Sequence, residues 1–153
     1  MPIQSKTESA KISASEWQTP GRGLLEGKSL RTGITLVRYV TDVVGEGPTL
    51  HVHPYDEIFT ITEGRARFTV GDKTIDAEAG DVVLGPANIP HGYQNLGPGR
   101  LESLDIHLSP AAELKVDIVV GGPYSSGVLV GGDRFEYKKA SPEISIFESM
   151  RKK

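Results

Sequence analysis

The chain has 153 residues, of which 37% are hydrophobic, and it carries a formal net charge of −3 and no cysteine. A chain of this length is expected to form one domain around its own core, and the absence of a basic excess argues against a nucleic-acid partner. Without cysteine, disulfide and thiolate chemistry are excluded, so a metal site would have to use nitrogen and oxygen ligands.

The N-terminal segment, residues 1–16, is polar and shows no strong pattern of secondary structure. It lacks the apolar centre of a secretory signal, and no later run is long enough to cross a bilayer. We therefore predict a flexible arm over residues 1–16, on a soluble, cytoplasmic protein that has no membrane partner.

From residue 29 onward, short apolar or alternating runs are separated by Gly, Pro, Asn and Asp, a pattern typical of an all-β sandwich or barrel. Signals for helices are weak. The strands are predicted within residues 29–44, 49–53, 57–64, 65–72, 73–79, 81–86, 91–97 and 100–109. Gly71, Asp72 and Lys73 form a plausible hairpin turn between the fourth and fifth of these strands.

Residues 111–153 differ from the preceding strands because glycine-rich turns separate their short apolar runs. One of these turns, GGPYSSG, lacks the GK[ST] ending of a phosphate-binding loop and is not followed by a helical pattern, so a nucleotide site is not expected there. We predict one β-barrel domain over residues 17–110 and a C-terminal β extension of the same domain, built of extra β-hairpin material, over residues 111–153.

The stretch HVHPYDEIFTITEG, residues 51–64, places two histidines and a glutamate in an otherwise β-forming run. Successive side chains of a strand point to opposite faces, so His51 and His53 share one face, and Glu57 follows with the same parity beyond a bend expected at Pro54. An ionised glutamate among apolar neighbours is costly to bury unless a cation compensates it. Imidazole and carboxylate donors in this arrangement suit Fe, Mn, Ni, Cu or Zn.

A fourth donor, His91, follows the run GDVVLGPANIP, in which an apolar strand meets a proline-rich turn. Asn88 lies where that turn is expected to need a positive φ, which asparagine tolerates better than most residues. Asn95 can hydrogen-bond nearby backbone and fix the path of the chain beyond the histidine. The turn is therefore expected to aim His91 at the other three donors.

These two stretches resemble the paired motifs of the cupin superfamily. The first motif, G(X)5HXH(X)3-4E(X)6G, is matched at each defined position by Gly45, His51, His53, Glu57 and Gly64. The second, G(X)5PXG(X)2H(X)3N, is matched by Gly80, Pro86, His91 and Asn95. The one departure is Asn88, which stands where the family usually has glycine. The resemblance implies a cupin-type jelly-roll β-barrel, or double-stranded β-helix, whose lumen holds one divalent metal ion per chain bound by His51, His53, Glu57 and His91.

Three further residues are weaker candidates for a catalytic role. Tyr55 and Tyr93 lie beside the expected ligands and could donate a phenolic hydrogen bond, although packing is the commoner role of such a tyrosine. In the run LESLDIHLS, His107 shares a face with Ser103 and Asp105. If that face lines the lumen, Asp105 and His107 could form an acid/base pair near the metal; if it faces outward, both are solvated. The sequence leaves the two alternatives open.

The run GITLVRYV, residues 33–40, is apolar on both faces, which leaves open whether Arg38 or Tyr39 points into the lumen. A strand of this kind is expected to be covered on both sides, by the lumen and by a partner subunit or the N-terminal arm. This pattern leads us to predict a homodimer.

The resemblance does not select one reaction, because cupins include dioxygenases, decarboxylases, isomerases, lyases, sugar-binding regulators and storage proteins. We expect a metal-dependent enzyme that acts on a small oxygen-bearing organic molecule, with dioxygenase chemistry as the first choice. An isomerase or lyase would need a protein base that the sequence does not identify, and a non-catalytic module that binds a sugar-like small molecule is a further alternative. A lumen that is apolar beyond the ligands would favour binding, whereas a positioned Tyr, His or Arg would favour catalysis.

Overall fold

A computed structural model describes residues 9–112, 116–117, 126–129 and 135–138 of the chain. Within these ranges nearly all regular structure is β-strand. The two helices found there, α1 (Ala14–Trp17) and α2 (Gly27–Leu30), have four residues each. The all-β prediction is therefore confirmed.

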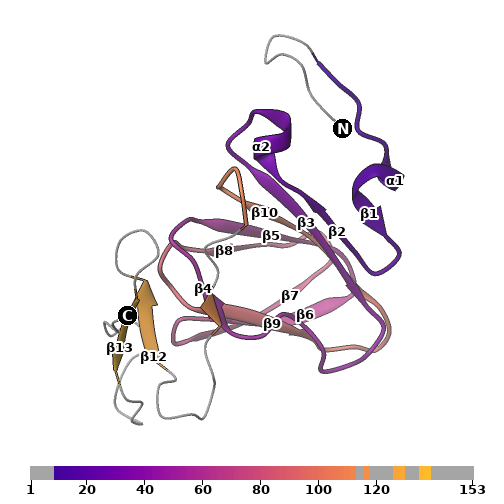
Figure 1. The fold of residues 1–153 in the computed structure, drawn as a ribbon. Coiled ribbons are helices and arrows are strands. Elements are labelled where there is room, and N and C mark those ends of the chain that lie inside the picture. The colour runs from indigo at the N-terminus through magenta and orange to yellow at the C-terminus, as the bar shows by residue number, and fades with distance from the viewer. Residues whose placement is uncertain (1–8, 113–115, 118–125, 130–134, 139–153) are drawn as a thin grey trace.

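The described strands form two main antiparallel sheets, which face each other in Figure 1. The larger sheet has the order β1 (Gln18–Thr19), β2 (Arg22–Leu25), β3 (Thr35–Thr41), β10 (Leu101–His107), β5 (Glu57–Glu63) and β8 (Val82–Gly85). The smaller sheet has the order β11 (Val116–Asp117), β4 (His51–Val52), β9 (His91–Asn95), β6 (Arg65–Val70) and β7 (Lys73–Glu78). Neighbouring strands within each sheet are often distant in sequence, so the chain passes repeatedly from one sheet to the other.

Each of the eight predicted strands is present, as β3 to β10. The predicted turn at Gly71 and Asp72 is confirmed: Val70 and Lys73 are paired across the hairpin, and Gly71 has a φ of 62°. The hairpin formed by β12 (Ser126–Leu129) and β13 (Phe135–Lys138) confirms β-hairpin material in the C-terminal region. Most of residues 111–153 lies outside the described ranges.

The N-terminal region contains elements that the sequence reasoning missed. The helix α1 begins inside the predicted arm, and the Glu16 carboxylate accepts a hydrogen bond of 2.8 Å from the Ser13 N–H. The spacing of Ser13 and Glu16 is that of a capping box, a signal that was visible in the sequence. The strand β2 then pairs with β3 and widens the larger sheet. Residues 1–8 lie outside the described ranges, and the division of the chain at residues 16 and 110 stays a prediction.

Between the two sheets lies a cluster of buried hydrophobic residues, which we call the core layer. Its members are Phe59, Ile61, Ala66, Phe68, Val70, Ala77, Val83, Tyr93 and Leu101. Aromatic rings dominate its centre, where the Phe68 ring lies 5.0 Å from that of Phe59 and 4.7 Å from that of Tyr93, measured between centroids. Burial of these large side chains is the main stabilising contribution to the fold.

The register of the strands places a set of polar residues beside the core layer. On β5 and β10, Glu57 pairs with His107, and the next pair on the same face is Phe59 with Asp105. We call the five residues His51, His53, Glu57, His91 and His107 the histidine layer. All five are buried. Since every second side chain of a strand faces inward, β5, β9 and β10 supply residues to both layers.

The outward face of the larger sheet is apolar where the strands β3, β10, β5 and β8 cross it. One row of cross-strand partners there consists of Leu36, Ile106, Ile58 and Leu84. Tyr39 packs against the core layer, whereas Arg38 lies on the outward face and forms an ion pair of 3.2 Å with Glu102. This arrangement answers the question that the sequence left open for residues 33–40. No helix in the described part of the chain is long and apolar enough to cross a membrane.

Candidate metal centre

The four donors predicted from the sequence converge in the histidine layer. One ligand atom from each lies within 4.8 Å of the others, in the group His51, His53, Glu57 and His91. His51 comes from β4, His91 from the start of β9 and Glu57 from the start of β5. Glu57 is only 2% exposed, so it faces inward with the histidines despite the break in the strand at Pro54.

The backbone near His91 is shaped to bring its ring into the site. His91 is the cross-strand partner of His51. Asn88 has a φ of 66°, as predicted, and its N–H donates to the carbonyl of His53 at 2.9 Å. A Cβ atom at Gly85 would lie 2.9 Å from the Phe59 ring and 3.3 Å from Nδ1 of His91, so only glycine leaves room for both rings. The sequence reasoning did not single out Gly85.

Beyond His91, the side chain of Asn95 fixes the path of the chain, as predicted. Its Oδ1 accepts from the N–H of Gly97, and its Nδ2 donates to the carbonyl of Gly99, both at 2.8 Å. Hydrogen bonds of Asn88 thus hold the turn before β9, and hydrogen bonds of Asn95 hold the turn after it.

Backbone carbonyls orient the three imidazoles of the predicted ligand set. Nδ1 lies within hydrogen-bond distance of a carbonyl oxygen two residues away in each case, namely Thr49 for His51 (2.7 Å), Tyr55 for His53 (2.8 Å) and Ile89 for His91 (3.0 Å). A carbonyl can only accept, so Nδ1 carries the proton and the neutral ring presents a lone pair at Nε2. This is the arrangement in which histidine binds a metal through Nε2.

Distances at Glu57 fit a shared cation. Its Oε1 lies 2.8 Å from Nε2 of His53 and 3.1 Å from Nε2 of His91. Two ligand atoms that are each about 2.1 Å from one ion, at right angles, are roughly 3.0 Å apart. Lone pairs that face a carboxylate oxygen at this distance repel one another unless a positive charge lies between them. The donor set therefore fits a divalent metal ion.

The protonation states of these groups suit the same ion. Burial lowers the pKa of His51 to about 3, and burial likewise lowers the pKa of His53, so both rings are neutral at neutral pH. Burial by itself raises the pKa of Glu57, but the contacts of its carboxylate with the imidazoles of His107, His53 and His91 outweigh burial and hold that pKa below its usual range. His51 and His53 as neutral imidazoles and Glu57 as a carboxylate are thus in the forms that coordinate metals.

His107 lies in the same layer, next to Glu57. Its Nε2 is 3.2 Å from Oε2 of Glu57, and its Nδ1 is 3.0 Å from the Tyr55 hydroxyl. The Tyr55 ring stacks on His53, with centroids 4.0 Å apart and planes 6° from parallel. The polar face of β10 is therefore the lumen face, which the sequence alone did not decide.

Asp105 and Tyr93 lie one step further along the lumen. The Tyr93 hydroxyl donates to Oδ2 of Asp105 at 2.7 Å and lies 2.8 Å from Oγ of Ser103. Burial raises the pKa of Asp105 well above its usual value, as does the charge of Glu57, and burial also raises the pKa of Tyr93. Asp105 thus bonds Tyr93, whereas His107 bonds Glu57 and Tyr55. The acid/base pair of Asp105 and His107 is not formed among the described contacts.

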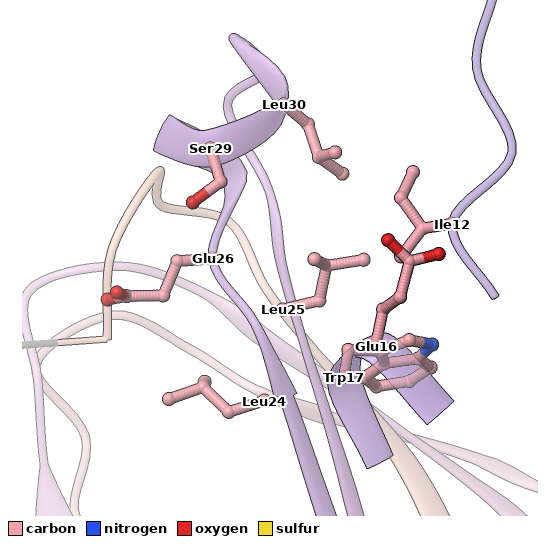
Figure 2. A pocket seen from close by; sticks show the side chains of 8 residues that line it. All are labelled: Ile12, Glu16, Trp17, Leu24, Leu25, Glu26, Ser29 and Leu30. Carbon is pink, nitrogen blue, oxygen red and sulfur yellow. The ribbon is translucent and has the colours of Figure 1, made fainter. Parts of the chain in front are cut away.

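A separate pocket of about 200 Å³ lies between α1, β2 and α2 (Figure 2). Its lining residues are Ile12, Glu16, Trp17, Leu24, Leu25, Glu26, Ser29 and Leu30. Both of its carboxylates already have partners: Glu16 accepts from Ser13, and Glu26 accepts from the N–H of Ala112 at 3.2 Å. The pocket contains no residue of the histidine layer.

Comparison with known proteins shows a likeness to cupin domains. Residues 38–107 match the family model described as "Cupin domain". A protein of Methanocaldococcus jannaschii, named as uncharacterized, is 30% identical over 77 residues, which are 50% of this chain and 62% of that protein. The match therefore spans less than two thirds of the relative's length.

Two solved structures show the same likeness. One is a conserved protein with a double-stranded β-helix domain from Klebsiella pneumoniae, with 24% identity, a TM-score of 0.55, and coverage of 69% of this chain and 94% of that chain. The other is the oxalate decarboxylase of Bacillus subtilis, a protein with Mn(II) centres, with 24% identity, a TM-score of 0.57, and coverage of 65% and 29%. At these identities the likeness shows the fold alone. It confirms the predicted double-stranded β-helix.

Proposed function

We propose that this chain, which is similar to cupin domains over residues 38–107, is a metal-dependent enzyme, most specifically a dioxygenase, that acts on a small oxygen-bearing organic molecule. The observation that carries the proposal is the convergence of four buried donors on Oε1 of Glu57. In this proposal one divalent ion is bound through His51, His53, Glu57 and His91.

The residues around the site have defined roles toward such an ion. The carbonyls of residues 49, 55 and 89 hold the imidazoles with Nε2 directed inward, and burial excludes bulk water from the donors. When bound, a divalent ion supplies Lewis-acid polarisation of a carbonyl or enolate oxygen and, if it is redox-active, a route for dioxygen chemistry. Fe, Mn, Ni, Cu and Zn all accept this donor set, and Mn is the metal found in the Bacillus subtilis protein of similar fold.

The polar groups of the lumen support catalysis over binding alone. Beyond the four proposed ligands, the lumen carries His107 hydrogen-bonded to Tyr55, and Asp105 hydrogen-bonded to Tyr93. Positioned Tyr and His side chains beside the proposed ligands favour catalysis, whereas a lumen that is apolar beyond the ligands would favour binding alone. Tyr93 also packs its ring in the core layer, so of the two tyrosines Tyr55 is the one beside the proposed metal ligands.

The state of these polar groups supports dioxygenase over isomerase or lyase chemistry. An isomerase or lyase needs a protein group that can accept a proton from the substrate. Both ring nitrogens of His107 are engaged, one by Glu57 and one by Tyr55. Burial raises the pKa of Asp105 and so favours its protonated form, which cannot act as a base. Neither group offers an available base.

Elemental analysis followed by an oxygen-uptake screen tests this proposal. The protein is purified without added chelator, its metal is identified, and the metal-free protein is reloaded with that ion. Small diketones, phenols and hydroxy acids are then tested for oxygen consumption, with His91→Ala as the control that lacks a proposed ligand. Substrate-dependent oxygen uptake by the loaded wild type supports a dioxygenase. Turnover without oxygen, or binding without turnover, would contradict it.

We also propose that the protein is a homodimer in the cytoplasm whose partner is a small molecule rather than a nucleic acid or a membrane. The apolar outward face of the larger sheet supports the dimer, because Val82 and Leu84 on it are 64% and 54% exposed. In this proposal a second copy of the chain packs on that face and buries it in a symmetric dimer interface.

A further inference from the structure

The two carboxylate oxygens of Glu57 have different surroundings. Oε1 faces the imidazoles of His53 and His91, at 2.8 Å and 3.1 Å from their Nε2 atoms. Oε2 instead lies 3.2 Å from Nε2 of His107. One oxygen therefore belongs to the proposed ligand set, and the other is directed to the strand β10.

His107 presents a donor to Glu57 rather than a lone pair. A carboxylate can only accept hydrogen bonds, so Nε2 of His107 carries the proton. In the neutral ring Nδ1 then accepts from the Tyr55 hydroxyl, 3.0 Å away. This is the opposite tautomer to that of His51, His53 and His91, in which Nδ1 donates to a backbone carbonyl. The sequence alone gives no sign that the fourth histidine of the chain differs from the other three in this way.

The position of His107 is fixed from several sides. It is the cross-strand partner of Glu57 on β5 and of Thr35 on β3. The Tyr55 hydroxyl donates to Nδ1 of His107, and the ring of Tyr55 is itself stacked on His53. A donor held in this way can hold the carboxylate group that it bonds, since outer partners of a metal ligand fix that ligand's orientation.

We infer that His107, anchored by Tyr55, is a positioning residue that holds Oε2 of Glu57 away from a bound metal ion and restricts this carboxylate to a single coordinating oxygen. The inference rests on the proposed function, because it presumes an ion at the histidine layer. A carboxylate that coordinates through both oxygens occupies two positions around an ion, whereas one that uses Oε1 alone occupies one. His107 thereby reserves a position for the small oxygen-bearing substrate.

The test compares wild type with His107→Phe and His107→Gln. Metal-free protein is titrated with Mn(II) and with Zn(II), and infrared difference spectra of loaded minus free protein report whether a carboxylate coordinates through one or two oxygens. Glu57→Gln identifies the bands that belong to Glu57. We expect a one-oxygen signature in wild type and a two-oxygen signature in His107→Phe, with a metal affinity about 10- to 100-fold weaker. His107→Gln should restore the wild-type signature, because its amide N–H can donate to Oε2.

Two additional variants separate positioning from general damage. Tyr55→Phe keeps the ring that stacks on His53 but removes the hydroxyl that bonds His107. The infrared signature of Glu57 should therefore lie between the one-oxygen and the two-oxygen forms. Ser103→Ala changes another buried, inward-facing residue of β10, one that bonds Tyr93, and should leave the Glu57 signature unchanged. If His107→Phe does not fold, the contrast between Tyr55→Phe and Ser103→Ala decides the question.

The outcomes that contradict the two claims are distinct. If His107→Phe keeps the infrared carboxylate signature and the metal affinity of wild type, the inference is overturned and the metal site stands. If His107→Phe does not fold, the same result in Tyr55→Phe overturns the inference. Failure of wild type to bind either ion would overturn the proposed function, and the inference with it.

Discussion

The histidine layer and the core layer share the strands β5, β9 and β10, yet their chemistry is opposite. On β5, Glu57 belongs to one layer and Phe59 to the other; on β9, the same step leads from His91 to Tyr93. Apolar burial in the core layer stabilises the fold, whereas burial of polar groups in the histidine layer costs stability unless each group is paired. A step of two residues along one strand therefore leads from a residue of the histidine layer, which is proposed to carry the function, to a residue of the core layer, which stabilises the fold.

The largest expected effect is on the core layer, in Phe68→Ala. Phe68 is fully buried, and its ring packs against those of Phe59 and Tyr93. Removal of the ring should lower the free energy of unfolding by about 3–5 kcal/mol, through lost burial and the cavity that remains. Urea unfolding of the metal-free protein measures this loss. A loss under about 1 kcal/mol would mean that the core layer does not carry the stability assigned to it.

Glu57→Gln, in the histidine layer, should weaken metal binding while the protein stays folded. The change keeps the volume of the side chain but removes the negative charge that the proposed ion requires. Metal affinity should fall about 100-fold or more, since even the loss of a partner outside the ligand set costs about 10- to 100-fold. Isothermal titration with Mn(II) measures the affinity, and circular dichroism establishes that the variant is folded. An unchanged affinity in a folded variant would exclude Glu57 as a ligand.

Asp105→Asn tests a polar group that lies beside the core layer. The folded-state pKa of Asp105 is raised by burial, so the stability that it contributes is present below its ordinary pKa of 3.8 and is lost as the pH rises toward the folded-state value. Asparagine does not titrate and keeps an oxygen that can accept from Tyr93. The variant should therefore gain stability over wild type above pH 4, by up to about 1.4 kcal/mol per pH unit. Urea unfolding of both metal-free proteins at pH 4 and pH 7 should show a difference that grows with pH. A constant difference would contradict the raised pKa.

Leu84→Glu should leave both layers unchanged, because Leu84 lies on the outward face of the larger sheet and is 54% exposed. If that face is the dimer interface, the added charge should convert a dimer into a monomer without loss of metal. Light scattering at micromolar concentration measures the mass of both proteins. A wild-type protein that is already monomeric would contradict the proposed dimer.

The sequence predicted the eight strands and the four converging donors because each rests on local pattern. Alternation along a strand fixed which histidines share a face, and the residue types of a turn indicated the positive φ of Asn88. These features depend on neighbours within a few residues of each other.

Features that depend on neighbouring strands could not be predicted in this way. β10 alternates Ser103, Asp105 and His107 with apolar residues, and usual experience would place the apolar face inward. The structure does the reverse, since β10 passes beside the histidine layer and its apolar residues Leu104 and Ile106 lie on the outward face of the larger sheet. The tautomer of His107 and the space beside Gly85 also follow from residues that are distant in sequence.

Metal content of the natively purified protein, measured beside that of His51→Ala, His53→Ala and His91→Ala, tests the central claim most directly. Each substitution removes one Nε2 from the proposed site and leaves the core layer in place. We expect about one divalent ion per folded wild-type chain and strong loss of that ion in all three variants, which should still fold. The same metal content in wild type and in all three variants would show that the histidine layer does not hold the metal.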